Sequence, residues 1–289
     1  MNLYAWIYAA RPKTLVASIV PILCATFILP KQTVFKLHVF IFTLMAATII
    51  QITTNYINDL YDFLKGADEA RIGPTRMIQS GALSKPEILL AIKLLIIIGV
   101  LCGIPLVMVG GWPIVIIGLS SFLFAYLYTA GPFPLAYNGL GDLFVFIYFG
   151  IIAVLGSYYL QVGFIDKGAI FLGISLGAKN VILLTINNIR DYDTDKKVNK
   201  KTLIVLFGQW FGIFQIVFML IISYFFLYLL SLQLENLNIF YILSLSLPLA
   251  LNILYDICNK NKIVLNKTLA KVSLLLVLEC ILIAIGMNI

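Results

Sequence analysis

The chain has 289 residues, of which 62% are hydrophobic and 11% are charged, and its formal net charge is +7. A soluble domain carries about 25% charged residues, so this composition excludes a soluble globular protein and indicates an integral membrane protein. The excess of basic residues is explained by membrane topology first and by attraction to anionic lipid or a phosphorylated substrate second, and it does not favour nucleic-acid binding.

The amino-terminal residues do not have the pattern of a removable signal peptide, because no basic leader precedes a short apolar core and a cleavage site. They carry Tyr4, Trp6 and Tyr8 instead. Aromatic side chains of this kind favour the depth of the lipid headgroups, so we expect a short interfacial helix before the first span.

Nine apolar segments follow, and their lengths are close to the roughly 20 residues that a membrane-spanning helix requires. Their bounds are Thr14 to Leu29, Val39 to Ile57, Ile88 to Val109, Pro113 to Thr129, Phe144 to Leu160, Gly168 to Thr185, Leu206 to Leu230, Leu237 to Ile257 and Thr268 to Met287. We therefore expect an all-α membrane protein with about nine transmembrane helices, forming a single domain.

The loops between these segments differ strongly in charge. Fourteen basic residues fall on the side of the amino terminus, and only Lys31, Lys36 and Lys167 fall on the other. Because cytoplasmic loops are enriched in lysine and arginine, the amino terminus is expected in the cytoplasm and the carboxyl terminus outside. The expected location is the plasma membrane of a bacterial cell.

Two short stretches hold 7 of the 13 acidic residues, and each lies at the end of an apolar segment. In the first stretch, Asn55, Asp59 and Asp62 are spaced at i, i+4 and i+7, which places them on one face of a helix. Asp68 and Glu69 follow a few residues later.

The second stretch has the same character, about 132 residues further along the chain. Asn187, Asp191 and Asp195 are spaced at i, i+4 and i+8. If Asn188 is taken in place of Asn187, the spacing is i, i+3 and i+7. Asp193 points away from this face and is expected to be solvated. Both stretches end even-numbered segments and precede basic loops. This weak internal symmetry divides the chain into two related halves, about 1–135 and 136–289, of the kind that membrane folds use to build a site between them.

Carboxylate and amide oxygens without nearby histidine or cysteine suit a hard divalent cation, and Mg2+ commonly bridges a few carboxylates and the phosphates of a substrate. The single histidine, His38, falls beside the opposite membrane face. Basic residues after each acidic stretch would neutralise a diphosphate leaving group. The pattern therefore predicts a substrate with a diphosphate head at the cytoplasmic surface and a tail in lipid.

Other interpretations of these residues are open. Each acidic loop by itself could be a solvated surface, although two loops with matching spacing argue against that. A cation transporter also uses carboxylates, but its sites lie near the middle of the bilayer and these clusters lie at span ends. The four cysteines, Cys24, Cys102, Cys258 and Cys280, are scattered and are expected to be packing residues.

At these motifs the chain resembles the UbiA superfamily of intramembrane prenyltransferases, and more closely its 1,4-dihydroxy-2-naphthoate polyprenyltransferase branch, which serves menaquinone synthesis. The resemblance rests on Ala10-Arg11-Pro12-Lys13-Thr14-Leu15, Asn58-Asp59-x-x-Asp62, Gly73-Pro-x-Arg76, Tyr128-Thr-Ala-Gly131-Pro-x-Pro134-Leu-Ala-Tyr137, Gly139-Leu-Gly-Asp142, Gly156-Ser-Tyr-Tyr159-x-Gln161, Asn187-Asn-x-Arg190-Asp191-x-Asp-x-Asp195-x-Lys197 and Lys201-Thr202-Leu203.

The resemblance implies a nine-helix fold around a central cavity and an Mg2+-dependent prenyltransferase. Carried over to this chain, the metal and diphosphate set would be Asn55, Asp59, Asp62, Asp191 and Asp195, with the four aspartates catalytic. The expected substrate contacts are Arg76, Lys197 and Lys201 for the diphosphate, Arg11 for the carboxylate of the acceptor and Tyr128 for the carbocation, with Tyr126, Tyr148, Tyr158 and Tyr159 as further aromatic candidates.

The implied reaction joins a polyprenyl diphosphate to an electron-rich ring carbon, which in the naphthoate branch loses its carboxylate as CO2 and gives demethylmenaquinone. Two departures affect the site. Phe133 stands where many relatives carry a basic residue, and Asp68 lies six residues after Asp62 instead of the four of the ubiquinone-side pattern. Alternatives are transfer to 4-hydroxybenzoate or homogentisate, or a non-catalytic isoprenoid-binding or transport protein. A CDP-alcohol phosphotransferase is disfavoured because its Asp-Gly-x-x-Ala-Arg pattern is missing.

Two charged residues, Lys179 and Glu279, fall about eleven residues into their spans and therefore near the middle of the membrane. A charge there is costly unless it is paired or faces a wet cavity. We expect either that the two side chains neutralise each other or that Lys179 lines the acceptor pocket; a protonated Glu279 against lipid is the alternative.

Overall fold

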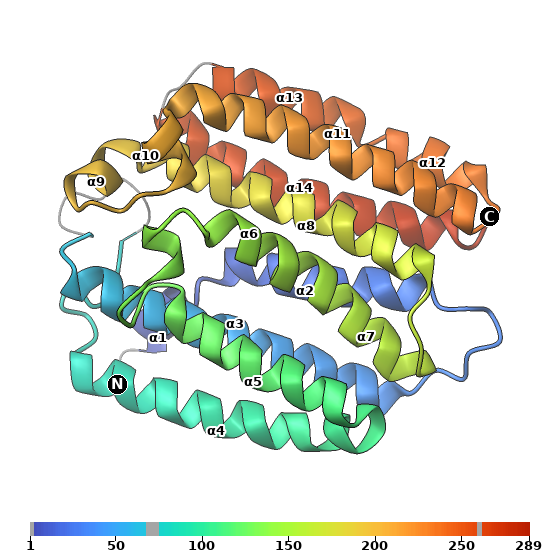
Figure 1. The fold of residues 1–289 in the computed structure, drawn as a ribbon, viewed down its shortest axis with the longest axis horizontal. Helices are drawn as coiled ribbons and strands as arrows, with labels where there is room; N and C mark the ends of the chain where they lie inside the picture. Colours follow the sequence, from blue (N-terminus) through green and yellow to red (C-terminus); the bar gives the residue numbers. More distant parts are fainter. Residues whose placement is uncertain (1–2, 68–74, 259–261) are drawn as a thin grey trace.

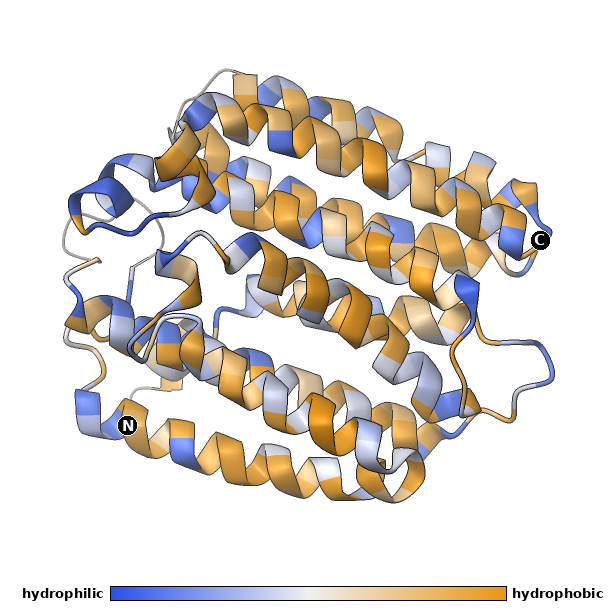
Figure 2. Cartoon of the chain, in the orientation of Figure 1, coloured by the Kyte–Doolittle hydropathy of each residue, from blue (hydrophilic) through white to orange (hydrophobic). Residues whose placement is uncertain are grey.

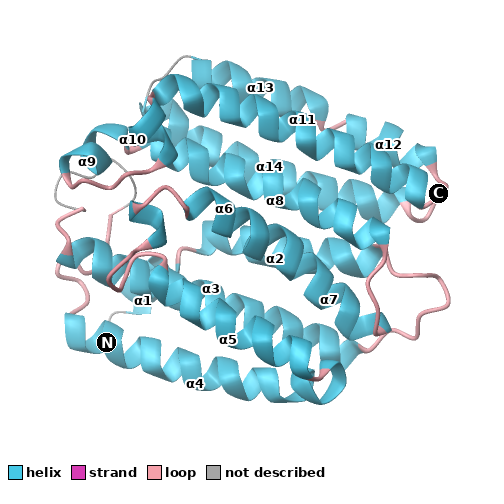
Figure 3. Cartoon of the chain, viewed as in Figure 1, coloured by secondary structure: helices cyan, strands magenta, loops and turns pink. Residues whose placement is uncertain are grey.

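The computed structural model describes residues 3–67, 75–258 and 262–289, and these residues form helices and loops without a strand (Figure 3). The helices are α1 (Leu3–Ala10), α2 (Pro12–Phe27), α3 (Leu37–Leu64), α4 (Lys85–Gly110), α5 (Trp112–Leu127), η1 (Leu135–Tyr137), α6 (Gly141–Phe146), η2 (Ile147–Ile152), α7 (Ala153–Val162), α8 (Lys167–Arg190), α9 (Tyr192–Lys197), α10 (Leu203–Phe207), α11 (Gln209–Gln233), α12 (Leu237–Ser244), α13 (Leu247–Cys258) and α14 (Lys262–Gly286).

The prediction of an all-α membrane protein is confirmed. Within the described residues, six helices are long and apolar enough to cross a membrane: α3, α4, the continuous run Gly141–Val162, α8, α11 and the part Val264–Gly286 of α14. Two bent pairs, α1 with α2 and α12 with α13, bring the number to eight at most. The fourth predicted segment corresponds to α5, whose 16 residues span only about 24 Å at 1.5 Å per residue.

The bend between α1 and α2 is 49° and lies at Arg11, whose φ of 50° is left-handed. Pro12 follows and starts α2, as expected for a residue that lacks an N–H and has a fixed φ. The bend separates α1, with Tyr4 exposed on its surface, from the first span. This arrangement agrees with the predicted short helix before the first span.

Helix α8 lies at the centre of the bundle and is its most buried helix, between α6, η2, α11 and α14 (Figure 1). Its glycines allow a close approach to the π-helical segment η2. A Cβ atom added at Gly150 would lie 2.3 Å from the Cα atom of Gly177 and 2.5 Å from the carbonyl oxygen of Gly173. The two backbones are therefore in direct contact, which leaves no room for a larger residue.

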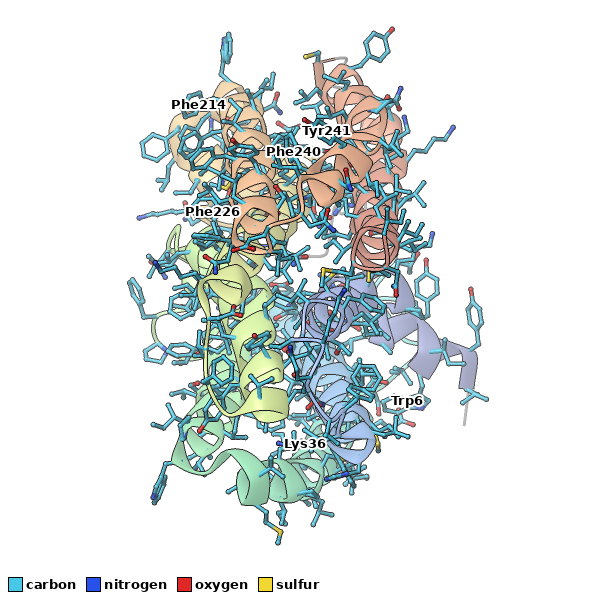
Figure 4. The ribbon with its side chains drawn as sticks, turned by 90° about the vertical axis from the view of Figure 1, so that its right-hand side faces the viewer. Trp6, Lys36, Phe214, Phe226, Phe240 and Tyr241 are labelled. Atoms are coloured by element: carbon cyan, nitrogen blue, oxygen red, sulfur yellow. The ribbon has the colours of Figure 1, made fainter. Side chains whose placement is uncertain are left out.

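The helices run roughly parallel to the long axis, and polar residues gather at the two ends of the bundle (Figure 2). One end carries the ends of α3 and α8 together with α9, α10 and α1, and the carboxyl end of α14 lies at the other (Figure 1). Figure 4 views the bundle from the second end, where Lys36 lies. There the backbone N–H of Lys36 donates to Gln161 Oε1 at 3.0 Å, and Gln161 Nε2 donates to the carbonyl oxygen of Lys36 at 3.2 Å. These two hydrogen bonds connect the α2–α3 loop to α7.

Candidate active site

The first acidic motif lies on α3 as its spacing predicts, with Asn55, Asp59 and Asp62 all buried. Arg76 connects the two aspartates: its Nε lies 3.7 Å from Asp59 Oδ1 and its Nη2 lies 3.3 Å from Asp62 Oδ2. The backbone N–H of Met77 donates to Asp59 Oδ2 at 3.2 Å. Arg76, predicted as a diphosphate contact, thus neutralises the carboxylates of its own half.

Asn55 connects this motif to the break between α1 and α2. Its Nδ2 donates to the carbonyl oxygen of Ala10 at 2.8 Å and to the hydroxyl of Thr14 at 3.1 Å, and its Oδ1 accepts from Gln51 at 3.5 Å. Arg11 follows Ala10 directly. The backbone of Arg11, the predicted acceptor contact, therefore lies next to Asn55 of the first motif.

The second motif departs from the prediction of one continuous helical face. Helix α8 ends at Arg190, Asp191 is its C-cap, and Asp195 lies on the separate helix α9. At this break the guanidinium of Arg190 donates two hydrogen bonds of 2.6 and 2.7 Å to the carboxylate of Asp191, and it also donates to Asn266 Oδ1 at 3.0 Å. Sequence analysis did not assign a contact to this buried arginine, although a cation next to an acidic motif was a usable signal.

Asp195 is buried on α9, and its Oδ1 lies 3.6 Å from Lys200 Nζ. The prediction that Asp193 faces solvent is confirmed, since its side chain is exposed. Lys197 and Lys201, the predicted diphosphate contacts of this half, are also exposed. Of the lysines after the second motif, Lys200 is therefore the one that faces the buried carboxylate.

Tyr137 joins the two halves. Its hydroxyl donates to Asp62 Oδ1 at 2.9 Å, and its carbonyl oxygen accepts the backbone N–H of Lys201 at 3.1 Å. Lys65 Nζ lies 4.1 Å and Lys200 Nζ lies 5.3 Å from the centre of its ring. Sequence analysis named Tyr137 only as the last residue of a motif and gave it no role. Its contacts with Asp62 and Lys201 join residues far apart in the chain, and such contacts leave no local sequence pattern.

Lys65 is a second residue of the site to which sequence analysis gave no role, because it was counted only among the basic residues that indicate the membrane orientation. Its Nζ donates to the carbonyl oxygen of Thr129 at 2.6 Å, and Thr129 in turn donates to Asn58. Burial lowers the pKa of Lys65 below its ordinary value; the carboxylate of Asp62 opposes this shift, and the ammonium of Lys200 adds to it. The two lysines are thus close enough to repel each other.

Tyr128 lies at the same end of the bundle. Its hydroxyl is close enough to Asp142, Asp62 and Asp195 for their carboxylates to interact with it electrostatically. Asp142 is buried and accepts a hydrogen bond of 2.8 Å from Gln215. The predicted substrate contact Tyr128 therefore lies within electrostatic range of carboxylates from both halves.

The donor set fits a hard divalent cation by its chemistry, because it consists of carboxylate and amide oxygens from the end of α3 and from the α8–α9 segment. Within the part of the chain that the structure describes, no group of three or more histidine, cysteine, aspartate or glutamate side chains is close enough together to hold a metal ion. The carboxylates lie against Arg76, Arg190 and Lys200 instead. A metal would therefore have to draw them together. Asp68 lies outside the described residues.

An apolar cavity of about 450 Å3 lies between α3, α4, α5 and the α6–η2–α7 run. On α3 it extends from Thr43 to Thr54, which corresponds to about 16 Å along the helix. Tyr128, Gln51 and Thr54 line the end next to Asn55, and Leu160 lines the end near Lys36. The cavity thus starts beside the first aspartate motif and runs into the apolar part of the bundle.

Two of the five candidate tyrosines, Tyr128 and Tyr148, line this cavity. The other three do not line it. Tyr158 is buried and donates to Asp166 at the far end, Tyr126 packs edge-on against Tyr61, and Tyr159 packs against the cluster of Val39, Leu106, Ile114 and Leu160. Phe133 is exposed on its loop and contributes no charge to the site.

A model of the UbiA prenyltransferase family matches residues 18–275 of this chain. The chain is 34% identical over 212 residues to the 1,4-dihydroxy-2-naphthoate octaprenyltransferase of Escherichia coli K12, covering 71% of this chain and 69% of that protein. It is 30% identical over 297 residues to the protein of the same name from Haemophilus influenzae, covering 99% and 96%.

The fold is similar to solved structures of UbiA homologues. One from Aeropyrum pernix K1, in its apo form, superposes with a TM-score of 0.73 at 15% identity over 95% of this chain and 96% of that one. One from Archaeoglobus fulgidus, bound to GPP and Mg2+, superposes with a TM-score of 0.70 at 14% identity over 97% and 99%. At these identities the likeness establishes the fold alone.

Proposed function

The chain belongs to the UbiA prenyltransferase family, and from this premise we propose that it transfers a polyprenyl group from a polyprenyl diphosphate to 1,4-dihydroxy-2-naphthoate with loss of CO2. The product is demethylmenaquinone, and the pathway served is menaquinone biosynthesis. The acceptor assignment is supported above all by relatives of that name that match up to 99% of the chain.

The proposed diphosphate site is formed by Asp59 and Asp62 of the first half and Asp191 and Asp195 of the second, with Asn55 as a further oxygen donor. Mg2+ held by these oxygens would neutralise the negative charge that develops on the leaving diphosphate. Arg76, Lys197 and Lys201 are the proposed cationic contacts of the diphosphate. The chain is proposed to be one prenyltransferase domain built from two weakly related halves, about 1–135 and 136–289, which supply one motif each.

The apolar lining of the cavity beside Asn55 supports its assignment to the prenyl tail. With the diphosphate at the motifs and the tail in the cavity, the allylic C–O bond lies at the end lined by Tyr128. When this bond breaks, both electrons leave with the diphosphate and a carbocation remains on the prenyl group. Attraction to a desolvated aromatic ring stabilises a cation by about 2 kcal/mol or more, which Tyr128 and Tyr148 can supply.

The acceptor carbon that carries the carboxylate attacks the carbocation in the proposed second step. The C–C bond to the carboxylate then breaks, its electrons return to the ring, and CO2 leaves. Arg11, held beside the first motif by the contact of Asn55 with Ala10, is the proposed partner of the acceptor carboxylate. The apolar cavity excludes water, which would otherwise trap the carbocation.

The protein is an integral membrane protein. We propose that it resides in the plasma membrane of a bacterial cell with both aspartate motifs at the cytoplasmic face, where a water-soluble diphosphate product can leave.

Ligand substitution tests the proposed chemistry. Asp59→Asn and Asp191→Asn should each reduce prenyl transfer by about 100-fold or more, because each removes a charge that organises the leaving group. Chelation of divalent metal should abolish turnover, and Mg2+ should restore it. Asp193→Asn is the matched control, since Asp193 is exposed on the same helix as Asp195 and should keep wild-type turnover. Near-normal turnover in Asp59→Asn or Asp191→Asn would remove the proposed site.

A further inference from the structure

The end of the apolar cavity next to Asn55 carries polar side chains, among them Gln51, Thr54 and Tyr128. The hydroxyl of Thr54 donates to the carbonyl oxygen of Ile50 at 2.8 Å, within α3 itself. A helical hydroxyl bound in this way has already used its proton. Gln51 and Tyr128 differ from Thr54 in this respect, and they are the side chains at this end that can bind a ligand.

Gln51 has hydrogen-bonding capacity that the fold does not use. It is only 7% exposed and lines the cavity one helical turn before Asn55. Its Nε2 makes one long hydrogen bond of 3.5 Å to Asn55 Oδ1, and within the described part of the chain its Oε1 accepts none. A side-chain amide can donate two hydrogen bonds and accept two, and buried polar groups are rarely left unpaired. The amide is therefore suited to a polar group of a ligand.

The hydroxyl of Tyr128 is available in the same way. It lies close to the backbone of Gly141, because a Cβ atom added at Gly141 would lie 3.2 Å from it. Among the residues that the structure describes, none forms a hydrogen bond with this hydroxyl. The next residue, Thr129, donates to Asn58 on α3 at 2.9 Å, which fixes the segment against the helix of the first motif. An amide and a phenol thus stand at the same end of the cavity.

The chemistry of the proposed substrates decides which of them these groups fit. The prenyl tail has no polar atom, and the diphosphate is anionic and is matched by metal and cations. The ring hydroxyls of the aromatic acceptor are neutral, and each both donates and accepts a hydrogen bond. The acceptor must also bring a ring carbon to the allylic carbon, which places its ring at this end of the cavity.

We propose that Gln51 and Tyr128 bind the ring hydroxyls of the acceptor and are specificity-determining residues for a hydroxylated ring. The assignment rests on the proposed function and deepens it, because it names the groups that recognise the acceptor. A site built to bind a hydroxyl rejects an analogue without one, since the polar groups of the site are then left unpaired. The hydroxyl of Tyr128 thereby has a task separate from that of its ring.

Direct binding of two naphthoates tests this recognition separately from catalysis. 1,4-Dihydroxy-2-naphthoate and 2-naphthoate share the ring and the carboxylate and differ in the hydroxyls alone. Calorimetry under nitrogen, on the full chain in lipid nanodiscs and without prenyl diphosphate, measures both Kd values. In the wild type the Kd of 2-naphthoate should be at least about tenfold higher than that of the dihydroxy compound. This ratio should fall about threefold in Gln51→Leu and in Tyr128→Phe, and to about one in the double variant.

Two matched variants serve as controls. Thr54→Val removes a hydroxyl at the same end that is bound within α3, and Tyr126→Phe removes one from a tyrosine that packs against Tyr61 outside the cavity. Both should keep the ratio of the wild type. Gln51→Glu should also keep it, because an acceptor oxygen remains and the added charge weakens both carboxylates alike. A partly unfolded variant loses binding sites for both compounds equally, so the ratio stays interpretable.

A ratio near one in the wild type, or an unchanged ratio in the double variant, would overturn the proposed contacts, as would a wild type that binds neither naphthoate. The proposed function fails differently. A wild type whose ratio depends on Gln51 and Tyr128 but that transfers no prenyl group to the naphthoate would refute the function and leave the hydroxyl contacts intact. Prenyl transfer with an unchanged ratio in the double variant would do the reverse.

Discussion

Lys179 on α8 and Glu279 on α14 form an ion pair, with 2.6 Å between Nζ and Oε2 and both side chains fully buried. Lys179 also contacts the hydroxyls of Ser175 and Ser223, and Ser246 donates to Glu279 Oε1 at 3.1 Å. The expectation that the two charges neutralise each other is confirmed. Lys179 is not among the described residues that line the apolar cavity, so it lies outside the proposed prenyl site.

The pair predicts a specific pattern of stability. Lys179→Met and Glu279→Gln should each lower the free energy of unfolding by about 3–5 kcal/mol, because each leaves a buried charge without its partner. The double variant should lose less than the sum of the two single losses. Thermal unfolding of the four proteins in one detergent measures this, and strictly additive losses would show that the ion pair does not couple the two helices.

Sequence analysis predicted the parts of the structure that depend on local patterns. The apolar spans match helices or bent helix pairs, and the spacing of Asn55, Asp59 and Asp62 predicted a common face that α3 has. The helix expected across Asp191 and Asp195 is interrupted: α8 ends at Arg190, and Asp195 lies on α9.

Contacts between the halves could not be predicted in the same way. The positions of Tyr137, Lys65 and Lys200 depend on how α3, η1 and α9 pack at one end of the bundle, and no spacing in the sequence encodes it. The local sequence likewise gave no means to separate Tyr148, which lines the cavity, from Tyr158, which binds Asp166 at the far end.

The contact between η2 and α8 makes Gly150 intolerant of a side chain. Gly150→Ala should lower the unfolding free energy by about 1–3 kcal/mol or more, because the new Cβ would overlap backbone atoms of Gly173 and Gly177 that cannot rotate away. Gly118→Ala on α5 is the control, since a Cβ there meets nothing within 4 Å. Equal melting temperatures for both variants would contradict the close backbone contact.

The cavity should set the length of the prenyl chain that the enzyme accepts. Gly103 on α4 lines the cavity and has open space around it, so Gly103→Phe should fill part of the volume. The ratio of kcat/KM for a long over a short prenyl diphosphate should fall by about tenfold. Leu101→Phe, on an exposed face of the same helix, should leave this ratio unchanged. A shift in both variants or in neither would exclude this cavity as the tail site.

The proposed orientation predicts which loops react from each side of the membrane. In a Cys258→Ser background, cysteine at the exposed position Lys31 should react with an impermeant maleimide applied to intact cells, and cysteine at the exposed position Lys196 should react only after lysis. Labelling of the Lys196 position in intact cells would reverse the orientation.

The most direct measurement is the mass of the product formed by purified protein from Mg2+, a polyprenyl diphosphate and 1,4-dihydroxy-2-naphthoate, with 4-hydroxybenzoate and homogentisate supplied in parallel. We expect a single prenylated and decarboxylated naphthoquinol, with one CO2 and one diphosphate released per prenyl group transferred. Transfer to either of the other acceptors in place of the naphthoate, or a naphthoate product that keeps its carboxylate, would contradict the proposed reaction.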